Sequence, residues 1–130
     1  MFKRLVPAGI HPPFARYAHG VMVPADAETI LCSGQLGIRP DKTVPADVEG
    51  QAEICFAAIA AILAEGGMTL ADIVKLNAYV TGREHLAGYM AVRDRVMTGP
   101  PVASTLMIVS GFARPEFVVE IEAIAARSAS

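Results

Sequence analysis

Two carboxylates near the C-terminus are the residues of this chain best suited to chemistry. Glu120 and Glu122 interrupt an otherwise apolar run at residues 117–125, which is rich in β-branched residues and follows the Arg114–Pro115 break. These features predict a strand. Its alternation places both carboxylates on one face. That face either meets water, as in many antiparallel sheets, or lines a pocket or subunit seam where a carboxylate acts as a base or proton donor.

Other residue types offer little competing chemistry. The chain contains three histidines and two cysteines, namely His11, His19, His85, Cys32 and Cys55. Their spacing matches no metal-binding motif, so we expect no metal and no cofactor. Both cysteines lie in apolar surroundings, which is typical of buried, reduced thiols in a cytoplasmic protein. Gly34 and Gly37 match no phosphate-binding motif, and a bulge or strand exit is favoured there.

Length and composition limit the possible functions. The chain has 130 residues and is expected to form a single domain over residues 1–130. Hydrophobic residues make up 53% and charged residues 18%, so self-association is expected to cover part of the apolar surface. A net charge of -2 without a basic cluster argues against nucleic acid as a partner. No apolar run has the length of a membrane span or a signal peptide, so we expect a cytoplasmic protein with no membrane partner.

The order of the expected elements indicates an α+β fold. Strands are predicted at residues 17–23, 29–33, 73–80, 102–110 and 117–125, and helices at 45–65 and 83–97. The first two strands and the last two strands are each expected to form a hairpin. The two strand–helix–strand pieces predict a mixed sheet with both helices on one face. No helix is left for the other face, so another subunit is expected to cover it.

Five short segments occur in an order and at distances that are familiar from one protein family. They are SGQ at 33–35, VPAD at 44–47, QA at 51–52, DIVK at 72–75 and EIEAIA at 120–125. With this ordered set the chain resembles the Rid (YjgF) family, whose best-known members are the RidA-type enamine and imine deaminases. The resemblance covers nearly the whole chain, residues 17–125.

The resemblance implies a chorismate-mutase-like α+β fold and a barrel-like homotrimer with three ligand clefts between subunits. In the family's deaminases, a glutamate on the last strand positions or activates the water that attacks the imine carbon, and it matches Glu120. A tyrosine near the start of the family sequence matches Tyr17. The backbone around Ser33 and Gly34 matches one wall of the cleft.

Three departures from the family pattern cluster on the implied cleft. The deaminases grip the substrate carboxylate with an arginine in the sequence Pro-Ala-Arg-Ser, whereas this chain has PVAS at 101–104 and therefore Ala103 at that position. Met90 takes the place of an asparagine often found on the second helix. Residues 111–114 are inserted before the last strand, and Arg114 in this loop is the cation considered as a replacement for the arginine.

Two readings of the function remain open. The first is a hydrolase of reactive enamines, imines or related C–N compounds, and the second is a non-catalytic trimer that binds a small metabolite in the same cleft. We favour the hydrolase. A third reading, a protein-binding module, is supported only by the apolar composition. Glu120 is the expected catalytic residue, and the expected substrate-binding residues are Tyr17, Ser33, Gly34, Met90, Ala103, Ser104 and Arg114.

Overall fold

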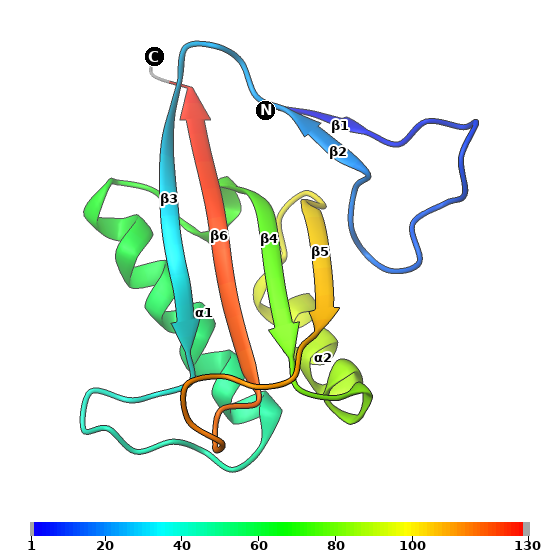
Figure 1. Ribbon diagram of the computed structural model, residues 1–130. Helices are drawn as coiled ribbons and strands as arrows, with labels where there is room; N and C mark the ends of the chain where they lie inside the picture. The colour runs from blue at the N-terminus through cyan, green and yellow to red at the C-terminus, as the bar shows by residue number, and fades with distance from the viewer. Residues whose placement is uncertain (1, 129–130) are drawn as a thin grey trace.

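A four-stranded mixed sheet with two helices on one face forms the body of the molecule (Figure 1). The computed structural model describes residues 2–128. The strands follow one another in the order β3 (Ala27–Leu36), β6 (Val119–Ser128), β4 (Ile73–Val80) and β5 (Ala103–Ile108). β6 is antiparallel to both β3 and β4, whereas β4 and β5 are parallel. This architecture confirms the predicted α+β fold with a mixed sheet.

Both predicted helices are present and lie behind the sheet in the view of Figure 1. α1 (Val48–Glu65) begins at Asp47, whose side chain accepts a hydrogen bond from the backbone N–H of Gly50, and ends at Gly66. α2 (Leu86–Val96) follows the short 3-10 turn η2 (Arg83–His85). A second 3-10 turn, η1 (Leu70–Asp72), leads into β4.

The core lies between the helices and one face of the sheet. Alternation along β4 and β6 turns every second side chain toward the helices, as the sequence predicts. The fully buried side chains of this layer include Leu76, Ala78, Val80, Val119, Ile121, Phe56, Ile59, Leu63, Tyr89 and Val92. Cys32 and Cys55 are also buried and free, as expected.

The predicted N-terminal hairpin is wrong. β2 (Gly20–Met22) does not pair with β3 but with β1 (Lys3–Leu5), in a separate two-stranded sheet. Figure 1 shows this pair beyond β5, with a long loop that projects from the body. The sequence gives no sign of β1, because three residues are too few for an alternating pattern. The Arg4 guanidinium ties β1 to the body by donating from Nε to the carbonyl of Pro101 at 2.8 Å.

The predicted C-terminal hairpin is also wrong, because β4 lies between β5 and β6. α2 connects β4 to β5, and a strand–helix–strand connection returns the second strand parallel to the first. The chain between β5 and β6 then crosses the end of the sheet to reach β6 (Figure 1). β6 begins at Val119 and runs to Ser128, two to three residues later than predicted.

One face of the sheet is not covered by any helix of the described chain, and we call it the open face. It carries Leu31, Lys75, Asn77, Tyr79, Thr105, Met107, Glu120 and Glu122. Leu31 is 74% exposed and Met107 is 46% exposed, so the open face mixes apolar and charged side chains. Within residues 2–128 there is no helix that is long and apolar enough to cross a membrane.

Candidate active site on the open face

The last strand places both candidate carboxylates on the open face. Val119 and Ile121 are fully buried against the helices, and the alternation of β6 therefore turns Glu120 and Glu122 to the other side. Both carboxylate residues are partly exposed in the single chain. The predicted division of this strand into a core face and a carboxylate face is confirmed.

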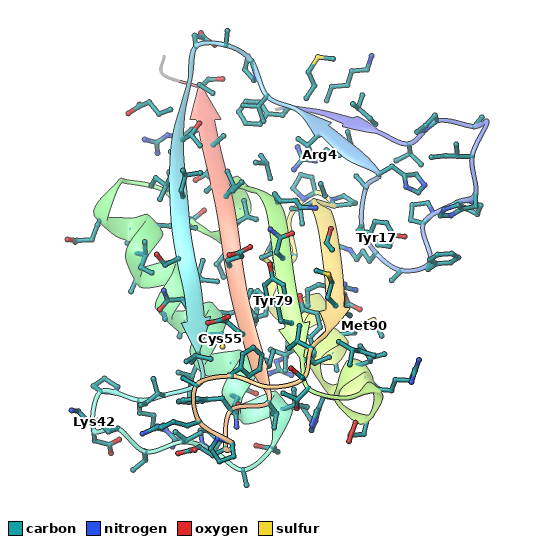
Figure 2. The ribbon with its side chains drawn as sticks, in the orientation of Figure 1. Arg4, Tyr17, Lys42, Cys55, Tyr79 and Met90 are labelled. Atoms are coloured by element: carbon teal, nitrogen blue, oxygen red, sulfur yellow. The ribbon has the colours of Figure 1, made fainter. Side chains whose placement is uncertain are left out.

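Glu122 is held in place by its neighbours on β4. Its Oε1 accepts a hydrogen bond from Asn77 Nδ2 at 3.0 Å and another from the Tyr79 hydroxyl at 2.8 Å. The hydrogen bond to Glu122 raises the pKa of the Tyr79 phenol, and desolvation and the charges of Glu122 and Glu120 add to the effect. Figure 2 shows Tyr79 in the middle of the sheet, on the side turned to the viewer. The Glu122 carboxylate thus serves as an acceptor within the fold.

Glu120 differs from Glu122 in having no hydrogen-bond donor among the residues that the structure describes. In the ladder it lies between Tyr79 on β4 and Leu36 on β3. Its carboxyl group rests against Gly34, where an added Cβ would be only 2.8 Å from Glu120 Cδ. Gly34 therefore leaves the space that this carboxylate occupies.

A bulge in β3 shapes this part of the site. The register between β3 and β6 shifts between Cys32 and Gln35, so of the two alternatives predicted at Gly34, a bulge or a strand exit, the structure shows the bulge. Ser33, within the bulge, is exposed. Beneath the bulge, Cys55 Sγ of α1 donates to the carbonyl of Gln35 at 3.2 Å. Burial and, second, the charge of Glu120 raise the pKa of the Cys55 thiol to about 12, so it remains a protonated donor.

The structure separates the neighbouring residues Ala103 and Ser104. Ala103 is paired with Lys75 and lies on the open face, whereas Ser104 is paired with the buried Leu76 and lies on the helical side. The ammonium group of Lys75 donates to Thr105 Oγ1 at 2.8 Å, which places a cation close to Ala103.

Tyr17 lies beyond the β5 edge, outside any strand (Figure 2). Its hydroxyl accepts a hydrogen bond from the backbone N–H of Phe14 at 3.2 Å. The segment is anchored to the end of α2, because the Arg16 guanidinium donates to the carbonyls of Met97 and Gly99 at 2.7 and 2.6 Å. With β4 and β5 between them, Tyr17 and Glu120 are not neighbours within one chain.

Met90 lies apart from Glu120 within the chain, and Arg114 is paired with a residue of its own loop. Met90 belongs to α2 and packs against the core, on the helical side of the sheet. Arg114 forms an ion pair with Glu116, with its Nε 3.3 Å from Oε2, and its guanidinium carbon lies 4.8 Å from the centre of the Phe117 ring. Of the predicted site residues, the single chain brings together Glu120 and Gly34, with Ser33 next to them in the bulge.

Three residues of the open face were absent from the predicted site: Lys75, Asn77 and Tyr79. The alternation of residues 73–80 indicates that they share a face, but only the strand order shows that this face also holds the carboxylates. In the sequence, Gln51 stands out only as part of the QA segment at 51–52. The structure shows that its side chain makes three hydrogen bonds to backbone groups.

Two hollows of the chain lie away from the carboxylates. One, of about 350 Å³, lies between the ends of α1 and α2, and the other, of about 580 Å³, lies near Arg4, Asp72 and Arg127. Glu120 lines neither of them. Within residues 2–128, no group of three or more histidine, cysteine or acidic residues could hold a metal ion.

The fold and the open face define a class of small α+β proteins in which the carboxylate-bearing side of a mixed sheet has no helical cover. The sequence profile of the family described as Endoribonuclease L-PSP matches residues 10–127. The chain belongs to this family, also known as the Rid or YjgF family, which confirms the resemblance seen in the sequence.

Relatives and solved structures agree with this assignment. The TdcF protein of Escherichia coli (strain K12), described as a candidate reactive intermediate deaminase, is 31% identical over 106 residues, which cover 77% of this chain and 80% of TdcF. The crystal structure of the Rid-family protein YyfB of Yersinia pestis, a protein of unknown function, has a TM-score of 0.84 at 26% identity and covers 97% of this chain and 98% of its own. RidA of the Antarctic bacterium Psychrobacter sp. PAMC 21119 has a TM-score of 0.72 at 30% identity and covers 94% of each chain.

Proposed function

We propose that this protein is a hydrolase of reactive enamines, imines or related small C–N compounds, with Glu120 as the residue that activates water. The observation that carries the proposal is the contrast between the two carboxylates. Glu122 accepts two hydrogen bonds from β4, whereas Glu120 accepts none from the described residues and rests at the glycine that makes room for it. A carboxylate that the fold does not use is available for general base catalysis. The description of TdcF as a candidate reactive intermediate deaminase supports this class of reaction.

The proposed reaction needs only water and a proton carrier. The Glu120 carboxylate takes a proton from the water whose oxygen attacks the imine carbon, and the C=N double bond becomes a single bond. Glu120 then gives this proton to the nitrogen, which yields a carbinolamine. In the second step a proton passes from the carbinolamine hydroxyl through Glu120 to the amino group, the C–N bond breaks, and ammonia leaves as the C=O bond forms. One carboxylate can serve as base and then as acid within each step, because it gives up the proton that it has taken and is again a carboxylate when the step ends.

We propose that the cleft around Glu120 is completed by another copy of this chain in a homotrimer. Support comes from the open face, where Leu31 and Met107 are exposed, and from the position of both hollows away from Glu120. A neighbouring subunit that covers this face supplies the second wall of the cleft and shields the open face from bulk solvent. Tyr17, beyond the β5 edge, is then placed to contact a substrate across the subunit boundary.

The substrate range is proposed to differ from that of typical RidA proteins. Ala103 stands where the resemblance places the arginine that grips the substrate carboxylate, and Arg114 is occupied by Glu116 and the Phe117 ring. Lys75 is the cation nearest to Ala103 in the ladder, but an ammonium group is a point charge without the bidentate fork of arginine. Substrates without a carboxylate are therefore expected to be favoured over simple 2-imino acids.

The second candidate function is a non-catalytic trimer that binds a small metabolite in the same cleft. Two observations favour it: Ala103 stands at the position of the arginine, and an ion pair with Glu116 holds Arg114 in its own loop. Neither residue is then available to bind the carboxylate of a typical substrate. A screen of imines, enamines and other C–N compounds separates the two functions. Release of ammonia above the uncatalysed rate supports the hydrolase. A compound that raises the melting temperature and releases no ammonia, with no other compound hydrolysed, supports the binder.

A further inference from the structure

Gln51 is a fully buried polar residue, and two of its three side-chain hydrogen bonds are made to the segment that leads into β6. Its side-chain Nε2 donates to the carbonyl of Pro45 at 2.8 Å and to the carbonyl of Glu116 at 2.8 Å. Its Oε1 accepts from the backbone N–H of Val118 at 3.0 Å. A buried amide is costly unless it is paired, and here a single side chain satisfies backbone groups on both sides of Phe117.

These contacts lie immediately before Glu120. Residues 116–118 belong to no strand, so Gln51 supplies the partners that a neighbouring strand supplies elsewhere in the sheet. On its other side, the carbonyl of Val118 accepts from the N–H of Thr81 at 3.1 Å. A slip of one residue at this point would turn Glu120 from the open face into the core. The hydrogen bonds of Gln51 therefore act on the register that decides where Glu120 points.

The same face of α1 also reaches the bulge on the far side of Glu120. Cys55 lies four residues, about one helical turn, after Gln51, and its Sγ donates to the carbonyl of Gln35. The close approach between α1 and this end of β3 depends on Gly37, where an added Cβ would collide with the side chain and Cα of Gln51. α1 thus contacts both the segment that leads into β6, the strand of Glu120, and the end of β3 that pairs with it.

We propose that Gln51 and Cys55 are positioning residues for Glu120, with Gln51 fixing the start of β6 and Cys55 fixing the β3 bulge. The inference rests on the proposed role of Glu120 where it concerns turnover, but the placement of the carboxylate can be tested without a substrate. Gln51 is the stronger of the two, because it makes three hydrogen bonds and Cys55 makes one weak S–H bond.

The test compares Gln51→Met with Leu63→Ala, which removes a fully buried side chain at the other end of α1. The carbon-13 resonance of the Glu120 carboxyl group is identified by its loss in Glu120→Gln and is measured well below the melting temperature of every variant. Gln51→Met is expected to shift this resonance and to slow turnover about tenfold or more. Leu63→Ala is expected to lower the melting temperature and to leave the resonance and the turnover unchanged. If Gln51→Met changes only the melting temperature, as Leu63→Ala does, Gln51 is structural and the inference fails.

Gln51→Glu provides a second variant if Gln51→Met does not fold. A carboxylate at this position accepts from the Val118 N–H but faces two carbonyls, and a protonated carboxyl group can donate to one of them. Because burial raises the pKa of such a group, the difference in the Glu120 resonance between variant and wild type is expected to narrow as the pH falls from about 8 to about 6. A difference that is absent at both pH values overturns the inference. If the resonance shifts in the variant but the wild type hydrolyses no compound, the positioning role of Gln51 is supported and the proposed hydrolase function is rejected.

Discussion

The pair formed by Glu122 and Tyr79 gives the open face a titration behaviour that can be measured directly. Because the hydrogen bond and charge of Glu122 raise the pKa of Tyr79, Glu122→Gln is expected to lower it, as followed by ultraviolet titration of the phenol. A phenol pKa that is raised in the folded state stabilises the protein below the unfolded value of about 10, and this contribution is lost as the pH rises through the folded pKa. An unchanged Tyr79 titration in the variant contradicts the hydrogen bond between Tyr79 and Glu122.

The position of Ala103 leads to a prediction on substrate range. Imines of simple amino acids are expected to be hydrolysed about two decades more slowly than by a relative that has an arginine here, because a desolvated bidentate charge pair is lost. Ala103→Arg is expected to recover part of this activity, measured as kcat/KM for such imines.

Full activity of the wild type on those imines contradicts this account and indicates that another cation has taken over. Lys75→Met and Arg114→Met then form a matched pair of variants. Lys75 lies beside Ala103 on the open face, whereas Arg114 is paired with Glu116, so a loss confined to one variant identifies the cation.

Among the elements, the β3 bulge has the closest connection to the site. Gly34→Ala is expected to slow turnover about tenfold or more with a small change in melting temperature, because the new Cβ must displace the Glu120 carboxyl group, the partly exposed end of a flexible side chain. Gly9→Ala is the control, since an added Cβ there meets nothing within 4 Å. Equal turnover by Gly34→Ala and wild type shows that the carboxylate can move without loss and removes the bulge from the site.

The same elements show which parts of the fold were predictable. The bounds of β4 and the cap of α1 at Asp47 follow from local patterns, and the alternation of β6 identified its carboxylate face correctly. Strand partners were not predictable in this way, because pairing is decided between segments far apart in the chain. β2 joins β1 and β5 joins β4, so both predicted hairpins failed.

The candidate site was predictable to the same extent. Glu120 was named from both the strand pattern and the resemblance, whereas Gly34 was named from the resemblance alone, and the structure places the two side by side. Asn77 and Tyr79 were not named, because their role depends on β4 lying beside β6. Gln51 was missed as a positioning residue for the same reason, since its partners Glu116 and Val118 are more than 60 residues away.

For the molecule as a whole, the open face predicts its assembly. Sedimentation at micromolar concentration is expected to show a homotrimer, because the single chain leaves this side of the sheet and residues such as Leu31 exposed. Leu31→Glu is expected to weaken the assembly, since it adds a third carboxylate to a face that carries two. Ala57→Glu, on the exposed side of α1, is the control and is expected to leave the mass unchanged. A monomeric wild type contradicts both the trimer and the inter-subunit cleft.

The most direct test of the account is the turnover of Glu120→Gln, measured beside its melting temperature on the best substrate found in the screen. The glutamine keeps the shape of the side chain but cannot carry a proton, and the described fold makes no hydrogen bond to this carboxylate. The account predicts a melting temperature close to that of the wild type and a loss of turnover of about two to four decades. Wild-type turnover by a folded Glu120→Gln variant, or early unfolding of the variant, contradicts a catalytic role for Glu120.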